Sequence, residues 1–347
     1  MSTLYALWLV SLIISLIALA IMVGLIIARW ISQRRARARE AERRRLVPLL
    51  LGGEANGEQL AEAERAPDLL TDLATELIQM VRGEDKENFV ASAERLGVAE
   101  RLRYRLDHGS PRTRLAAAEA LADFADDAIS MDRLRRALDD PNADVRLAAA
   151  LALASVGQAP PARELVEKLG LGTHESSALT VGLFEEVARE RPGEIRELIE
   201  APDTHPYVKV AAIDALSASG DYSLVPIIAK LVLAAPDDAE ELPRYLDALG
   251  DFGHPAAASA VSKVLDSPEW KVRAAAAEAA GKIGMTDAAN RLAALLSDSH
   301  WWVRFRAGEA LALLGETGRW ALTEAAEHAP EPARSTAQLT LAERGLA

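Results

Sequence analysis

The sequence predicts an all-α fold: a solenoid of repeated helical hairpins, preceded by a single transmembrane helix. Three observations lead to this prediction. The chain begins with a long uncharged apolar run, it continues as a repeat of about 31 residues, and its composition disfavours a sheet. Half of its 347 residues are hydrophobic, but many of these are alanine, which favours helices. Stretches rich in the β-branched or aromatic residues that strands prefer are few.

The apolar run at residues 4–28 is long enough for a membrane span. As a helix it would measure roughly 37 Å, against a hydrocarbon core of about 30 Å. All the positive charges follow the run, which is expected of an uncleaved anchor rather than of a signal peptide. Ala20, Gly24 and Ala28 form a row of small residues. Such a row either lets a second transmembrane helix approach closely or arises by chance, because small residues are frequent in spans.

An arginine-rich segment sets the expected orientation. Residues 29–45 hold eight arginines and two glutamates. Because basic flanks stay in the cytoplasm, we expect a single-pass protein of the inner (cytoplasmic) membrane, with its N-terminus outside and its solenoid in the cytoplasm. The expected domains are a transmembrane anchor (1–30), a basic juxtamembrane segment and linker (31–62) and the repeat solenoid (63–347).

The charge of the body argues against nucleic acid as a partner. The whole chain carries a net charge of -13 and residues 1–45 carry +6, so residues 46–347 carry -19. A body this acidic repels phosphate backbones. The absence of cysteine excludes disulfides, thiolate metal sites and cysteine nucleophiles.

Two sequence columns define the repeat. Its anchor positions, 28 to 33 residues apart, are Asp85, Thr113, Val145, Ser176, Val208, Glu241, Val272, Val303 and Ala333. The residue after the anchor is basic in seven of nine units, and glycine stands twelve positions after it in seven of nine. In the unit that begins at Val303, apolar residues recur at i, i+4, i+7, i+8 and i+11, which is one face of a helix. A second amphipathic helix and a short turn complete each unit.

The segments "LDDPNADVRLAAALALASVG" (138–157), "LDSPEWKVRAAAAEAAGKIG" (265–284) and "LSDSHWWVRFRAGEALALLG" (296–315) resemble HEAT repeats, in particular the short bacterial form also found in phycobilisome lyase subunits. The resemblance covers roughly residues 80–347. It implies a right-handed, curved stack of helix pairs in which one set of helices lines a concave surface, and a role in protein binding. The units at 172–188 and 237–253 depart from the pattern, which puts the local curvature in question.

Equivalent positions form rows along such a stack. An acidic row six positions after the anchors is either a solvated surface or a recognition stripe for a basic partner: Glu119, Asp214, Asp247, Glu278 and Glu309. The resemblance implies that the basic residues after the anchors bond to aspartates of the inter-helix turns, at Asp107, Asp139, Asp203, Asp266 and Asp298.

An aromatic edge precedes several anchors. Tyr207, Trp270, Trp301 and Trp302 lie one or two positions before an anchor, and Arg304 and Arg306 follow nearby. Tryptophan, tyrosine and arginine concentrate at interface hot spots, so we predict that these six residues bind a partner. Filling of gaps between neighbouring turns is the alternative.

No motif indicates catalysis, and we expect no enzyme activity, cofactor or metal. The six histidines are scattered, and the repeated His-Glu pairs of HEAT-like di-iron hydroxylases are reduced here to His174 and Glu175. We therefore predict a membrane-anchored cytoplasmic scaffold or regulatory subunit. Its partner would be a membrane enzyme or transporter with a cytoplasmic domain, with a polysaccharide-synthesising glycosyltransferase as one candidate. The alternative is a bilin-lyase-like or other small-ligand-binding HEAT protein.

Overall fold

The computed structural model is all-helical. It describes residues 22–23, 29–30, 43–51, 61, 63, 65–124, 127–173, 177–217 and 219–345, and no strand occurs within these ranges. The chain divides into two compact units, Met1–Ala137 (unit 1) and Leu138–Ala347 (unit 2). The boundary between the units lies inside the predicted solenoid of residues 63–347. Of the predicted fold class, the all-helical solenoid of hairpins is confirmed, and the preceding transmembrane helix is not.

Unit 1 packs short helices around a leucine-rich core. Residues 43–50 are helical, and the following elements are α3 (Pro67–Ile78), α4 (Glu84–Arg95), α5 (Val98–His108), α6 (Pro111–Leu121), the 3-10 helix η1 (Ala122–Phe124) and α7 (Ala128–Ala137). Phe89, Leu102 and Leu121 are fully buried among them. Ser110 caps α6, because its hydroxyl accepts a hydrogen bond from the Thr113 amide at 3.3 Å.

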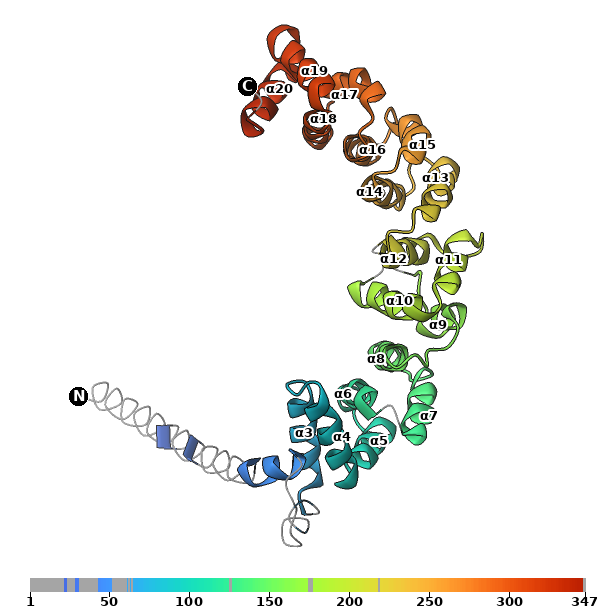
Figure 1. Ribbon diagram of the computed structural model, residues 1–347, viewed down its shortest axis with the longest axis vertical. Helices are drawn as coiled ribbons and strands as arrows, with labels where there is room; N and C mark the ends of the chain where they lie inside the picture. Colours follow the sequence, from blue (N-terminus) through green and yellow to red (C-terminus); the bar gives the residue numbers. More distant parts are fainter. Residues whose placement is uncertain are drawn as a thin grey trace, which may run out of the picture. The chain divides into compact units, whose positions relative to one another are not determined.

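Unit 2 continues the pattern as two rows of helices. Its elements are α8 (Ala143–Ser155), α9 (Ala162–Leu169), α10 (Ala178–Glu190), α11 (Pro192–Glu200), α12 (Pro206–Ser217), η2 (Tyr222–Leu224), α13 (Val225–Ala234), α14 (Leu242–Phe252), η3 (Pro255–Ala257), α15 (Ala258–Val264), α16 (Trp270–Ile283), η4 (Thr286–Ala288), α17 (Ala289–Leu295), α18 (Trp301–Leu313), α19 (Gly315–His328) and α20 (Ala333–Glu343). Figure 1 shows α12, α14, α16 and α18 side by side along the inner side of this unit, with α11, α13, α15 and α17 behind them. We refer to the first four as the inner helices.

The repeat columns explain the packing of the inner helices. In α18 the apolar face predicted from Val303 is buried: Val303, Ala307 and Leu311 are each 0% exposed. The glycine column ends the helices, as at Gly284, whose φ of 79° is the left-handed conformation that stops α16. The two repeats that depart from the pattern still form helices, α10 and α14. In α14, Pro243 occupies the first turn, where a missing amide hydrogen costs nothing.

Small residues bring three inner helices unusually close together. A Cβ atom added at Gly281 of α16 would lie 2.6 Å from the Cα of Ala310 in α18. One added at Gly250 of α14 would lie 3.0 Å from the Cα of Ala279 in α16. Backbone therefore packs directly against backbone, and long charged side chains can reach from one inner helix to the next.

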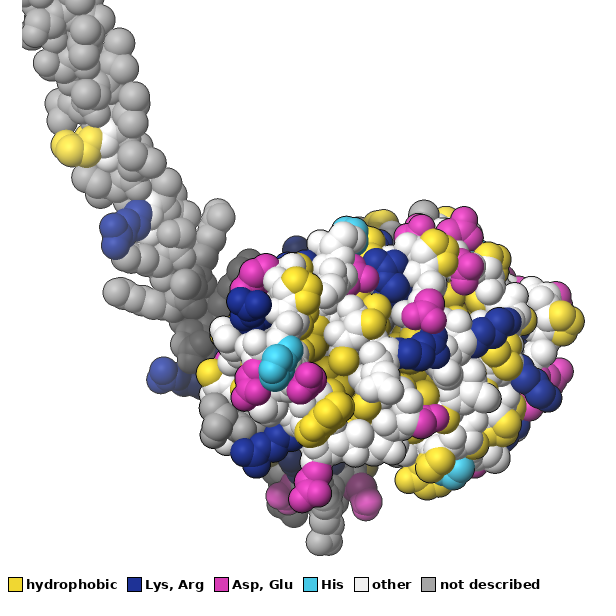
Figure 2. All heavy atoms as spheres, turned by 90° about the horizontal axis from the view of Figure 1, so that it is seen from above, with side chains coloured by type: hydrophobic (Ala, Val, Ile, Leu, Met, Phe, Trp, Pro, Cys, Tyr) yellow, Lys and Arg dark blue, Asp and Glu magenta, His cyan; other side chains and the backbone are white. Residues whose placement is uncertain are grey.

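The surface carries both signs of charge side by side. Figure 2 shows Lys and Arg interspersed with Asp and Glu on the face seen from above. Many of these groups pair between helices, as Arg133 does with Asp107 and Arg291 with Asp266. Exposed pairs of this kind contribute about 0–1 kcal/mol each. The buried apolar contacts between repeats therefore carry most of the stability.

The basic residues after the anchors bond differently from the expectation. Arg146, Arg304 and Arg334 donate to backbone carbonyls of the turn that precedes their own helix, for example from Arg304 to the Asp298 carbonyl at 2.8 Å. Most of the turn aspartates pair instead with bases on other helices, as Asp139 does with Lys168 and Asp203 with Arg163. Within the described residues, one of the five aspartates pairs with a basic residue that follows an anchor. This is Asp298, which pairs with Arg273. The reason is geometric, because an arginine in the first helical turn folds back over the unpaired carbonyls beside it.

The predicted inner-membrane location, with an outward N-terminus and a cytoplasmic solenoid, is contradicted. In the part of the chain that the structure describes, no helix is both long and apolar enough to cross a membrane. The longest of the labelled helices, α16 and α19, have 14 residues each, whereas a span needs about 20. The predicted anchor lies outside the described residues except at 22–23 and 29–30, and its packing row of Ala20, Gly24 and Ala28 lies outside them entirely.

Candidate functional site

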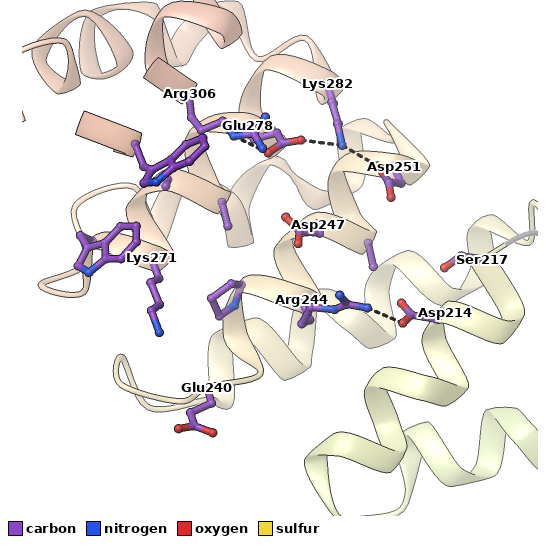
Figure 3. A pocket seen from close by; sticks show the side chains of 16 residues that line it. Asp214, Ser217, Glu240, Arg244, Asp247, Asp251, Lys271, Glu278, Lys282 and Arg306 are labelled. Carbon is purple, nitrogen blue, oxygen red and sulfur yellow. Dashed lines mark hydrogen bonds and ion pairs between the residues drawn. The ribbon is translucent and has the colours of Figure 1, made fainter. Parts of the chain in front are cut away.

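A groove of about 810 Å³ runs across all four inner helices of unit 2 (Figure 3). Nine of its sixteen lining side chains are charged: Asp214, Glu240, Arg244, Asp247, Asp251, Lys271, Glu278, Lys282 and Arg306. The small side chains of Ala248, Ala274 and Ala275 leave space between the charged groups. Because the inner helices stack in the order of the repeats, equivalent positions of successive repeats line the groove together.

Ion pairs hold three of the four basic side chains in the groove. Arg244 donates to Asp214 at 2.7 Å. Lys282 reaches Asp251 at 2.7 Å and Glu278 at 3.0 Å, and Arg306 lies 3.1 Å from the other Glu278 oxygen. These bonds cross from one helix to the next, except for the pair of Lys282 with Glu278 within α16. The groove therefore contains two sets of mutually neutralised charges.

Asp247 lies between these two sets. Figure 3 shows its carboxylate between Arg244 on one side and Glu278 on the other, with no dashed line to either. The structure gives Asp247 no hydrogen bond or ion pair to any residue it describes. Burial raises its pKa and the nearby Glu278 raises it further, while Arg244 and Lys282 act in the opposite direction. Asp247 is thus a partly desolvated carboxylate without a direct counter-ion.

Aromatic rings stand beside these charges. Trp270 begins α16 and stacks on His300, with ring centroids 4.8 Å apart and planes 12° apart. Trp302 begins α18 with Trp301, and each is 51% exposed. The Trp301 ring lies parallel to Phe305 at 5.2 Å, and Trp302 meets Trp301 edge-on at 4.7 Å. Trp301 and Trp302 therefore pack on neighbouring rings and still leave half of their own surface exposed.

Comparison with known proteins identifies the repeat. A family model described as HEAT repeats matches residues 99–176, 244–312 and 259–342, which together make up more than half of the chain. The chain belongs to the HEAT-repeat family. No curated protein matches it.

Solved structures share the HEAT fold at low identity. Kap121p bound to RanGTP is 14% identical with a TM-score of 0.50, and the match covers 88% of this chain and 38% of that one. Importin beta is 13% identical with a TM-score of 0.47, covering 90% of this chain and 53% of that one. The chain thus spans well under two thirds of the karyopherin chains that it matches. At such identities the likeness concerns the fold alone.

The HEAT stack brings together most, but not all, of the predicted partner-binding residues. Trp270, Trp302 and Arg306 line the groove. Tyr207 donates its hydroxyl to Glu240, which lines the groove in turn. Trp301 does not line it.

Arg304 also stays outside the groove lining, because its guanidinium is engaged with the carbonyls of Asp298 and Ser299. The aromatic edge and the acidic row, separate in the sequence, meet in this groove.

The acidic row divides between the two units. Asp214, Asp247 and Glu278 line the groove, as their common repeat position suggests. Glu309 lies beyond it and pairs with Arg344, and Glu119 belongs to unit 1. The row is therefore neither fully solvated nor uniformly free to bind.

The sequence reasoning predicted Arg306 but missed the other basic side chains of the groove, Arg244, Lys271 and Lys282. Arg244 and Arg306 both stand three positions after an anchor, so the repeat alignment contained a signal for them. Lys282 and Asp251 also share a repeat position, ten residues after the anchors Val272 and Glu241, so the alignment contained a signal for them too.

The chain shows no assembled metal centre where it is described. No group of three or more His, Cys, Asp or Glu side chains within the described ranges could hold a metal ion. His174 and Glu175 lie outside those ranges. The groove lining itself offers charged and aromatic side chains.

Proposed function

We propose that this chain is a protein-binding scaffold and that the groove of unit 2 holds a segment of its partner. The observation that carries the proposal is the groove itself, which crosses four successive HEAT repeats and combines half-exposed tryptophan with charged groups. Aromatic side chains and arginine dominate the energetics of protein interfaces. An elongated site of this kind suits an extended polypeptide segment.

The lining favours a protein over a small ligand. Pockets for small molecules are mostly apolar with a few polar groups, whereas nine of the sixteen residues here are charged. No observation in the groove favours a tetrapyrrole or another small ligand. No residue singles out a polysaccharide-synthesising glycosyltransferase or a role as a regulatory subunit, so neither forms part of the proposal.

Site-specific photocrosslinking tests the proposal. A photoreactive phenylalanine analogue replaces Trp302 in the groove, and in a control it replaces Trp320 of α19, which is 65% exposed and outside the groove. We expect a distinct crosslinked protein at position 302 that is missing at position 320. Purification of that protein with wild-type chain should then give a defined complex, which Trp302→Ala weakens about tenfold or more.

Trp320→Ala is the control for the binding measurement, because Trp320 is an exposed tryptophan that does not line the groove. Equal crosslinking at positions 302 and 320, or equal loss of affinity in the two alanine variants, would contradict the proposed site.

A further inference from the structure

The net charge of the chain resides in unit 2. Residues 138–347 contain 32 acidic and 19 basic residues, a net charge of -13, whereas residues 1–137 contain 20 of each. The unit that bears the groove therefore attracts positively charged molecules over distances of about a Debye length, roughly 8 Å at physiological salt.

Long-range attraction alone does not decide which acidic residue of the groove binds an incoming cation. The ion pairs already formed inside the groove do decide it. Arg244 is bound to Asp214, and Lys282 and Arg306 are bound to Glu278. A cationic side chain that entered the groove would have to displace one of these residues in order to pair with Asp214 or Glu278. Asp247 imposes no such exchange, because no described residue pairs with it.

The surroundings of Asp247 leave room for an incoming side chain. Ala248 follows Asp247 in α14, and Ala274 and Ala275 of α16 line the same groove. Figure 3 shows the Asp247 carboxylate in the central part of the groove, not at its rim. A carboxylate that is partly removed from water binds a cation more strongly than a fully hydrated one does.

We propose that the partner segment is basic and that Asp247 binds one of its lysine or arginine side chains. This inference rests on the proposed function. Trp302 and Trp270, at the same groove, contact the residues that flank this cation. Asp247 is then the residue of the groove that determines which partner segment is accepted.

Peptide binding to the full chain tests this inference. The probe is fluorescein-labelled hexa-arginine, with hexa-lysine as the second cationic probe and hexa-glutamine as the neutral one, and anisotropy reports binding. We expect Asp247→Asn to weaken binding of the cationic peptides by about tenfold, since a charge-assisted contact is lost. The matched control is Asp287→Asn, which removes the same charge from unit 2 at an exposed position of η4 outside the groove.

The outcomes separate this inference from the proposed function. Equal weakening by Asp247→Asn and Asp287→Asn would mean diffuse attraction and would overturn the role of Asp247. Binding of hexa-glutamine as tightly as hexa-arginine, or no binding of either cationic peptide, would overturn the basic partner. In each of these cases crosslinking at position 302 could still succeed, and the scaffold function would stand.

Discussion

At the scale of single residues, one ion pair joins neighbouring repeats more firmly than the others. Arg273 donates from Nε and Nη2 to the two Asp298 oxygens at 2.7 and 3.0 Å. Its Nη1 also donates to the carbonyls of Ser267 and Pro268. The two charged side chains are only 14% and 8% exposed, unlike most pairs on this surface. With four of its five N–H donors used in this way, the guanidinium fixes the turn before α16 to the turn before α18.

We predict that Arg273→Met destabilises the fold by about 3 kcal/mol, because the mutation removes the counter-ion of the buried Asp298 carboxylate and the side-chain donor of two carbonyls. Urea unfolding followed by circular dichroism measures the change. Arg136→Met is the control, since Arg136 pairs with Asp132 at a site where both side chains are more than half exposed. Its effect should stay within about 0.5 kcal/mol. Similar losses in the two variants would show that the buried pair has no special weight.

The same pair predicts a pH dependence. Burial would raise the pKa of Asp298, but the hydrogen bonds from Arg273 and from the His300 amide outweigh burial and lower the pKa below its usual 3.8. A lowered pKa in the folded state stabilises the protein above the unfolded-state value, and this contribution is lost as the pH falls through the folded-state value. The difference in unfolding free energy between wild type and Arg273→Met should therefore be constant near pH 7 and shrink below about pH 4. A difference that grows with acid would contradict this explanation.

At the scale of helices, the close approach of α16 and α18 depends on an absent side chain. Gly281 lies in the middle of α16, where glycine costs about 1 kcal/mol of helix stability relative to alanine. The structure explains the cost, because a Cβ there would lie 2.6 Å from a backbone atom of Ala310. Backbone cannot move aside as a flexible side chain can, so the two helices would have to separate.

We predict that Gly281→Ala lowers the unfolding free energy by about 1–3 kcal/mol, the usual cost of overpacking. Gly182→Ala is the matched control, since Gly182 also lies inside a helix, α10, but a Cβ there would meet nothing within 4 Å. That variant should be unchanged or more stable by up to about 1 kcal/mol. Thermal unfolding of the two variants measures both expected changes in stability. Stabilisation by both would mean that α16 and α18 tolerate separation.

The sequence predicted the helices better than the contacts between their side chains. Hydrophobic spacing placed Val303, Ala307 and Leu311 on a buried face, because burial follows helical period and needs no knowledge of neighbours. The partner of Asp298 could not be found in this way. Several long basic side chains lie at comparable sequence separations, and only the three-dimensional offset of the turns selects Arg273. The groove was half predicted, since the columns indicated its acidic and aromatic residues but not Arg244 or Lys282.

At the scale of the whole molecule, the net charge of unit 2 and the single charge of Asp247 should affect different steps of binding. The net charge of -13 on unit 2 acts at a distance and is shared by many exposed groups. The free carboxylate of Asp247 acts only on what has entered the groove. Diffuse charge mainly accelerates encounter, whereas a partly buried charge contact mainly slows dissociation. If both operate here, the kinetics of binding must separate them.

We predict that the association rate constant of hexa-arginine with the full chain falls steeply between about 0.05 and 0.5 M salt, because the screening length shrinks across this range. The dissociation rate constant should change much less with salt. The mutation Asp247→Asn should act mainly on the other rate constant. Association at low salt should stay within about twofold of wild type, while dissociation accelerates about tenfold. Stopped-flow fluorescence resolves both constants, and Asp287→Asn controls for the loss of one charge. An Asp247→Asn variant that slows association and leaves dissociation unchanged would place Asp247 among the diffuse surface charges, and the groove would then recognise its partner through its aromatic residues.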